Sequence, residues 1–265
     1  DIMSGWRQKV YNIFSLGWKG TDNQWRHYSR AYLYLAALAT PLVLSVHSVV
    51  SWDFAMSIIP GWHGTIFAPY FVAGAIYSGV GMVFTLIIPL RKVLKIEHMI
   101  TDYHFDNLAK LTLLTGSILF YAYLMEYFIG WYSGNVFEQT TFWRRAFGPM
   151  WWGGWTMIIC NAFVSQLFWF RKIRTNLTSL FIISIFINVG MWFERYVIIT
   201  SSLSNDFLPY AWSQMNPTWA DWGILVGSFG WFSMWFLLFA RTFPVVAIQE
   251  LKEQIPYPRL RKGGH

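Results

Sequence analysis

The chain has 265 residues, of which 55% are hydrophobic and only 12% are charged. This composition and a positive mean hydropathy exclude an ordinary water-soluble domain and indicate that the main solvent is lipid. The net charge of +7 comes from basic residues that flank apolar runs, so we expect no nucleic-acid binding.

Six apolar runs are long enough to span a bilayer, which needs about 20 residues in a helix. The runs are continuously apolar, whereas barrel strands alternate with a period of two. We therefore predict an all-α, polytopic membrane protein with six transmembrane helices, at residues 31–51, 66–90, 108–128, 150–170, 177–196 and 219–240. The expected organisation is a cytoplasmic N-terminal segment at 1–30, a transmembrane domain at 31–243 and a cytoplasmic tail at 244–265.

The basic residues fix the expected orientation. Of the 20 lysines and arginines, 17 fall on one side of the predicted helices. The positive-inside rule places that side, with both termini, in the cytoplasm. The other three, Arg144, Arg145 and Arg195, fall on the outer side.

His47, Asp53 and His63 lie between the first two predicted spans, near the outer face. Titratable groups are costly there and often functional. Asp53 follows an apolar helix and is suited to accept a proton from a bound hydroxyl, the alternative being a helix-end aspartate that faces water. We expect His63 to bond a ligand or transfer a proton, or else to order its turn.

Arg195 lies at the end of the fifth predicted span, on one helical stripe with Asn188 and Met191. Such a stripe can line a cavity, and an Arg195 that faced Asp53 could hold a ligand oxygen with it. The alternative is an arginine that snorkels to the interface or pairs with Glu194.

A proton path is a further hypothesis. Glu126 lies deep in the third predicted span and Asn161 lies in the fourth, where polar groups more often tie helices together. A cytoplasmic cluster that includes His98 and Asp102 could be a proton entrance, although its default interpretation is a solvated loop.

The residues give little support for a resident cofactor. A single cysteine, Cys160, cannot form an internal disulfide or an iron–sulfur site, and the histidines are poorly placed for a pair of axial haem ligands. We therefore expect this chain to bind no haem, iron–sulfur cluster or other metal, and any cluster to belong to a partner.

Three motifs carry a resemblance: HSVVSWDFA from His47, PGWHGTIFAPYFVAGAIYSG from Pro60, and MWFERY from Met191. Together they resemble the NrfD/polysulfide-reductase-like family of quinone-interacting membrane subunits. Within it the resemblance is closest to the ActC-like subunits of bacterial alternative complex III, and this chain corresponds to the later six helices.

This resemblance implies a quinol pocket at the periplasmic end of a four-helix bundle, at which Asp53 and Arg195 lie, with His63 as a less direct match. We expect His47 to bind the quinol as well. Menaquinol would be oxidised there, and its electrons would pass to a periplasmic iron–sulfur subunit, with proton translocation as a further expectation. Further implied partners are a second NrfD-like membrane subunit, cytochrome c subunits and lipid. The implied location is the bacterial cytoplasmic membrane.

Two other functions remain open. A transporter would show inverted repeats and broken helices near the midplane, for which Pro41 and the glycines of the second span are weak support. A structural anchor without ligand would tolerate changes at Asp53 and Arg195.

Overall fold

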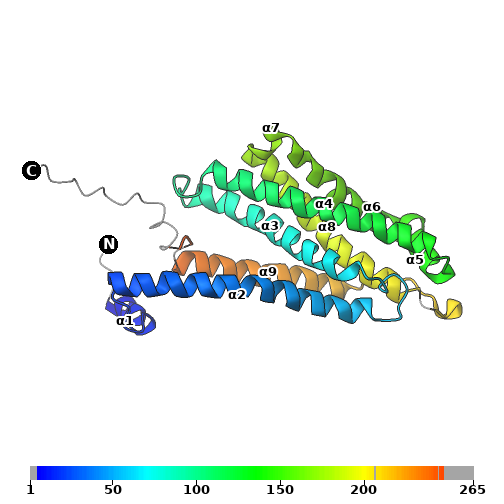
Figure 1. Ribbon diagram of the computed structural model, residues 1–265, viewed down its shortest axis with the longest axis horizontal. Coiled ribbons are helices and arrows are strands. Elements are labelled where there is room, and N and C mark those ends of the chain that lie inside the picture. The colour runs from blue at the N-terminus through cyan, green and yellow to red at the C-terminus, as the bar shows by residue number, and fades with distance from the viewer. Residues whose placement is uncertain (1–4, 206, 244, 248–265) are drawn as a thin grey trace, which may run out of the picture. The chain divides into compact units, whose positions relative to one another are not determined.

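The computed structural model describes residues 5–205, 207–243 and 245–247, and within them every regular element is a helix (Figure 1). Five helices are long and apolar enough to cross a membrane: α2 (Asp22–Ala55), α3 (Phe67–Val93), α4 (Asp102–Tyr132), α8 (Leu177–Leu203) and α9 (Trp219–Thr242). The chain is therefore an all-helical, multi-pass membrane protein. Most of the expected tail at 244–265 lies outside the described residues.

The chain divides into two compact units within α2. The first comprises residues 1–44 and 244–265, and the second comprises residues 45–243. In the first unit, the Trp18 ring packs edge-on against the rings of Trp25 and Tyr28. All of the candidate site residues belong to the second unit.

The core of the second unit is a bundle in which α3 packs against both α4 and α8 (Figure 1). Gly74, near the start of α3, lies against Arg195, near the end of α8, so these two helices are antiparallel. The aromatic ring of Tyr70 packs against Tyr123 near the end of α4, which makes this pair antiparallel too. The start of α3 thus lies beside the ends of α4 and α8. We call this the His63 end of the bundle.

The predicted span at 150–170 is a rod of three successive helical segments. They are α6 (Trp151–Ile158), the π-helix η1 (Ile159–Phe163) and the 3-10 helix η2 (Val164–Trp169). The rod packs on α4 and α8 and is the fourth member of the bundle. A π-turn changes the hydrogen-bonding register, and such turns are frequent at functional sites. Here it places Asn161 in the bundle interior, fully buried.

Gly190 of α8 allows the π-helix to approach closely. A Cβ atom at this position would lie 2.6 Å from the Cβ of Cys160 and would collide with the Asn161 side chain. Gly190→Ala is therefore expected to lower the free energy of unfolding by about 1–3 kcal/mol through overpacking. Gly79→Ala is the matched control, since nothing lies within 4 Å of its Cβ position. Unfolding in mixed micelles measures both, and equal stability of the two variants would contradict the close contact.

Short helices complete the described chain: α1 (Gly5–Phe14), α5 (Val136–Phe147), α7 (Arg171–Arg174) and the 3-10 helix η3 (Pro209–Ala211). The α5 helix follows the end of α4 and is capped by Asn135, whose side chain accepts a hydrogen bond from the Phe137 amide. It contacts α4, α6 and α8. The α5 helix therefore lies at the His63 end of the bundle, beside the candidate site residues.

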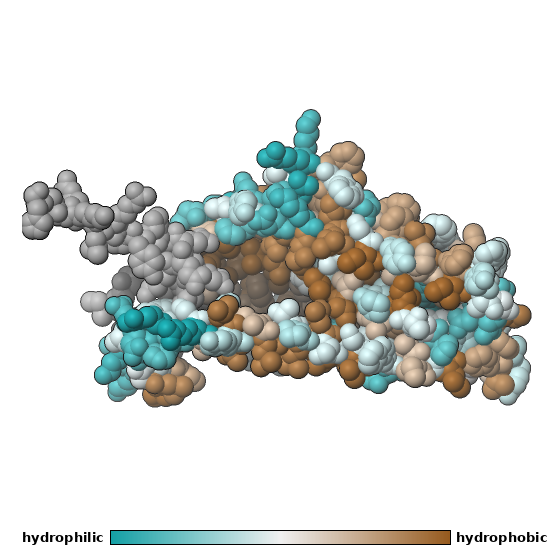
Figure 2. Space-filling model, viewed as in Figure 1, coloured by the Kyte–Doolittle hydropathy of each residue, from teal (hydrophilic) through white to brown (hydrophobic). Residues whose placement is uncertain are grey.

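The outside of the bundle is apolar, as expected of a surface in contact with lipid. Large apolar side chains of α8 such as Ile182 and Phe186 are 49% and 47% exposed. Figure 2 shows apolar side chains over much of the bundle face that it presents. Buried polar side chains such as Asn161 and Glu194 lie inside the bundle, and polar groups in such surroundings are often functional.

Candidate functional site

A cavity of about 210 Å³ lies at the His63 end. Its wall is formed by the loop before α3, the last two turns of α4 and the start of α5. The lining residues are Gly61, Trp62, His63, Gly64, Ile66, Phe67, Glu126, Ile129, Gly130, Ser133, Asn135, Glu138 and Phe142. Aromatic rings and three titratable side chains therefore face one small space.

Glu126, one of the three, forms an ion pair with Arg145 of α5 at 3.2 Å. The arginine is only 2% exposed. Its Nε donates to the Ser201 hydroxyl at 2.7 Å, and its Nη2 donates to the Ser202 hydroxyl at 2.9 Å. A buried guanidinium that donates to Glu126, Ser201 and Ser202 thus faces the Glu126 carboxylate and compensates its charge.

Glu138 of α5 and His63 of the loop before α3 are the other two titratable residues that line the cavity. The Glu138 carboxylate accepts a hydrogen bond of 2.9 Å from the Gly61 amide, which ties α5 to the loop before α3. Burial raises the pKa of the Glu138 carboxyl above its usual range, and the Gly61 hydrogen bond and the charge of Arg145 act in the opposite direction.

His63 contacts the Ser57 carbonyl oxygen through its Nδ1, at 3.1 Å. A carbonyl only accepts, so Nδ1 carries a proton and donates it to this bond. In the neutral ring Nε2 is then the acceptor, free to take a proton from a ligand.

A second polar cluster lies further inside the bundle, around Glu194 of α8, which is fully buried. Its Oε2 accepts hydrogen bonds from the Tyr123 hydroxyl and, at 3.3 Å, from Asn161 Nδ2. Its Oε1 pairs with Arg195 at 3.1 Å. Three side chains, one each from α4, η1 and α8, thus share the Glu194 carboxylate, and Asn161 also donates to the Tyr123 hydroxyl at 2.9 Å.

Arg195 is 35% exposed at its side chain and lies over the ring of Phe71, 4.1 Å from the ring centroid. Phe71 stacks on Phe67, a cavity residue, with centroids 4.4 Å apart. Phe54 of α2 packs on the same two rings. Arg195 therefore lies one aromatic layer behind the cavity wall.

Asp53 precedes Phe54 in the last turn of α2 and is exposed. None of the ion pairs in the described part of the chain joins it to Arg195, whose ionic partner is Glu194. The two predicted residues thus flank one aromatic cluster without touching. His47 lies two turns earlier on α2 and is exposed as well.

The residues of the predicted proton path are divided between the two ends. Glu126 and Asn161 belong to the two buried clusters just described. At the opposite end, Asp102 forms an ion pair of 2.9 Å with Arg91, and His98 is exposed in the turn before α4.

Sequence reasoning missed Arg145, Glu138 and Tyr123 as site residues. A signal for Arg145 was available, because it is one of the three basic residues that break the positive-inside pattern. Arg145 and Arg195 both pair with a carboxylate, and the third, Arg144, lies 5.2 Å over the ring of Trp212. Each exception to the charge rule thus has a specific partner.

Among the described residues, no three histidine, cysteine, aspartate or glutamate side chains come close enough together to hold a metal ion. Cys160 is a buried free thiol. The chemistry that these residues offer is proton transfer and hydrogen bonding at a cavity with aromatic walls.

Comparison with protein families matches the chain to the family described as polysulphide reductase, NrfD, over residues 6–204. The comparison with curated proteins gave no match. The matched segment contains the cavity and both buried clusters. Members of the family partner with iron–sulfur subunits in redox complexes. The chain therefore belongs to the polysulphide reductase NrfD family, the membrane subunits of quinol-linked oxidoreductases.

Proposed function

We propose that this chain is the quinol-binding membrane subunit of a quinol:electron-acceptor oxidoreductase of the alternative complex III type. It oxidises menaquinol near the periplasmic face of the bacterial cytoplasmic membrane and passes electrons to a periplasmic iron–sulfur subunit. A second NrfD-like membrane subunit and cytochrome c subunits complete the complex. In this proposal residues 150–170 form a sixth span, both termini are cytoplasmic, and the His63 end faces the periplasm.

The cavity at the His63 end is the observation that carries the proposal. A quinol needs a flat apolar slot for its ring and a hydrogen-bond acceptor for each of its two hydroxyl groups. The rings of Trp62, Phe67 and Phe142 supply the slot, while Glu126 and His63 supply acceptors on two sides. A site of this kind at a membrane surface is open to a lipid-soluble substrate and close to a periplasmic partner.

Oxidation of one quinol releases two protons and two electrons and leaves the quinone. We assign the first proton to the Glu126 carboxylate, which lies 3.2 Å from Arg145. The second goes to His63 Nε2, which is exposed and can release it to water. Both electrons would leave to the iron–sulfur group of the partner.

Arg195 and Asp53 take supporting roles in this proposal. The Arg195 guanidinium lies behind the Phe71 and Phe67 rings and favours negative charge that develops on the ring oxygen as the proton leaves. Asp53, exposed at the end of α2, would take a released proton on to water at the mouth of the site. From Glu126, protons can pass inward to the Glu194 cluster, which is our proposal for the start of a translocation path.

Menaquinol oxidation by the intact complex tests this function. Glu126→Gln keeps the shape of the side chain but removes the acceptor charge, so turnover is expected to fall about 100-fold. His63→Gln is expected to lower turnover as well, with a smaller effect because water can replace it. Glu97→Gln, an exposed carboxylate at the opposite end, is the control and should leave turnover unchanged. Full turnover in an assembled Glu126→Gln complex would move quinol oxidation to another subunit.

A further inference from the structure

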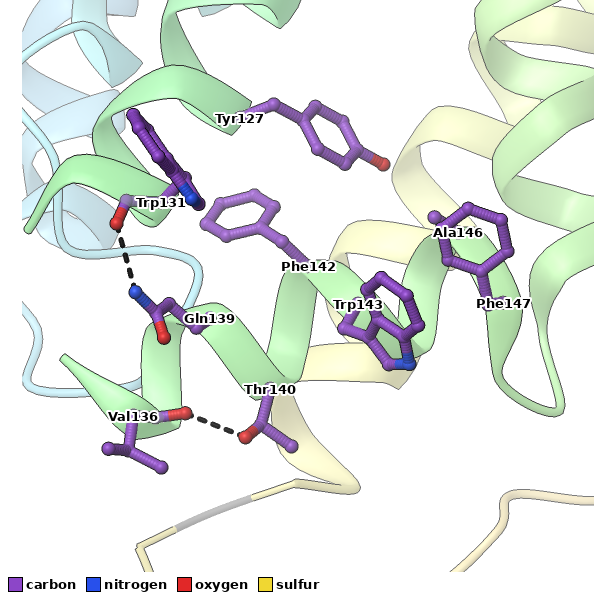
Figure 3. A pocket seen from close by; sticks show the side chains of 9 residues that line it. All are labelled: Tyr127, Trp131, Val136, Gln139, Thr140, Phe142, Trp143, Ala146 and Phe147. Carbon is purple, nitrogen blue, oxygen red and sulfur yellow. Dashed lines mark hydrogen bonds between the residues drawn. The ribbon is translucent and has the colours of Figure 1, made fainter. Parts of the chain in front are cut away.

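A second and larger cavity, of about 450 Å³, lies between the end of α4 and the outer side of α5 (Figure 3). Its lining residues are Tyr127, Trp131, Val136, Gln139, Thr140, Phe142, Trp143, Ala146 and Phe147. Figure 3 shows aromatic rings on several sides of this space. The polar ends of Gln139 and Thr140 are already bonded, to the carbonyl oxygens of Trp131 and Val136 at 2.9 and 2.6 Å.

The cavity is therefore suited to hydrocarbon. Its aromatic walls are partly open to the surroundings, with Trp143 and Phe147 exposed by 65% and 63%. The buried Tyr127 hydroxyl borders this space and has no hydrogen-bond partner among the described residues, but no charged side chain lines the cavity. In a membrane a space with mainly aromatic walls fills with a chain rather than with water.

Phe142 belongs to the walls of both cavities. On α4 the two cavities use neighbouring helical stripes: Glu126 and Gly130 face the smaller one, and Tyr127 and Trp131 face the larger one. Between them the Phe142 ring lies on Gly130, where an added Cβ would come within 2.5 Å of the ring carbon Cε2. The Phe142 ring thus borders both a cavity that holds two carboxylates and a histidine and a cavity without charged side chains, and we call these the polar and the apolar cavity.

We infer that the apolar cavity binds the isoprenoid tail of the quinol whose ring occupies the polar cavity. This inference rests on the proposed function. The substrate is an amphiphile with one small polar ring and one long apolar chain, and the two adjoining cavities divide in the same way. The Phe142 ring turns away from Gly130 to let the first isoprene units pass and then packs against them.

An added side chain in the apolar cavity should separate tail binding from ring chemistry. Ala146→Trp fills the space from α5. Leu124→Trp is the matched control, since it adds the same bulk to a position on α4 that is 53% exposed and outside both cavities. The intact complex is assayed with two substrates, menaquinol with its isoprenoid tail and menadiol, the naphthoquinol without a tail.

The expected result is a KM for tailed menaquinol that rises about 10-fold or more in Ala146→Trp, because buried hydrocarbon is lost from the bound state. The KM for menadiol should stay within about two-fold of the parent, and Leu124→Trp should change neither value. Thr140→Phe fills the same cavity from another position and repeats the test if Ala146→Trp does not assemble.

Three outcomes would overturn the inference. Unchanged kinetics in an assembled Ala146→Trp or Thr140→Phe complex would assign the cavity to acyl chains of the bilayer. An equal rise of KM for both quinols would show that the variant disturbs the ring site. A parent complex that oxidises menadiol but gains nothing from the tail would also reject the tail site, whereas a parent that oxidises neither quinol would reject the proposed function itself.

Discussion

Replacing Arg145 by leucine is expected to lower the free energy of unfolding by about 3–5 kcal/mol. The arginine is 2% exposed and bonds Glu126, Ser201 and Ser202, which belong to α4 and α8. Its removal leaves the Glu126 carboxylate buried without a compensating charge and leaves the serine hydroxyls without their donor. Unfolding of the purified chain in mixed micelles, titrated with a denaturing detergent, measures the loss.

The neighbouring residue offers a matched control. Arg144 carries the same charge on the same helix, and among the residues that the structure describes its side chain is held by its approach to the Trp212 ring. Arg144→Leu is expected to cost about 1 kcal/mol or less. The double variant Arg145→Leu with Glu126→Leu should recover much of the lost stability, since no buried charge is left unpaired. Equal losses in the Arg144 and Arg145 variants would refute the role of the buried ion pair.

The largest expected effect on turnover outside the cavity is that of Arg195→Leu. Loss of a cation behind the ring wall removes stabilisation of the anion that forms as quinol is deprotonated, and a loss of about 100-fold in menaquinol oxidation follows. Asp53→Asn should lower turnover less, because Asp53 is exposed and water can take its place. Menaquinol oxidation by the assembled complex measures both variants.

Structural damage needs to be separated from this effect, since Arg195 also pairs with the buried Glu194. The double variant Arg195→Leu with Glu194→Gln removes the uncompensated charge and should restore stability without restoring turnover. Recovery of turnover together with stability would show that Arg195 only supports the fold. Normal turnover in both Arg195→Leu and Asp53→Asn would favour a structural anchor.

The positions of the spans could be predicted from the sequence because a helix in lipid must present about 20 apolar residues in one run. Five of the six predicted runs fall on candidate membrane helices, and these helices extend up to nine residues beyond the predicted limits, as in Asp22–Ala55 for the run at 31–51. The predicted run at 150–170 corresponds to the rod of α6, η1 and η2. Its composition, however, gives no sign that the rod contains a π-helix and a 3-10 helix. That register depends on packing against Gly190, which is distant in the sequence.

The candidate site was predictable only in part. His63 and Glu126 stand out in the sequence as polar residues in apolar surroundings, and in the structure both line the same cavity. Glu138 and Arg145 lie in a short helix between two spans, where charged side chains are common, so their burial could not be inferred. An ion pair between two helices depends on which helices are adjacent in the fold, and the hydropathy pattern of the sequence does not give that information.

The partners of Arg145 also have an order along the chain. Glu126 precedes it, whereas Ser201 and Ser202 follow it and arrive only with the last turns of α8. During synthesis from the N-terminus, α5 therefore emerges before its binding place is complete. Its charge stays hydrated at the membrane surface until α8 has inserted, since an arginine without partners is costly in hydrocarbon. The docking of α5 onto α4 and α8 is then a late step in biogenesis. The cavity that Glu138 and Phe142 help to enclose therefore forms only when the bundle is complete.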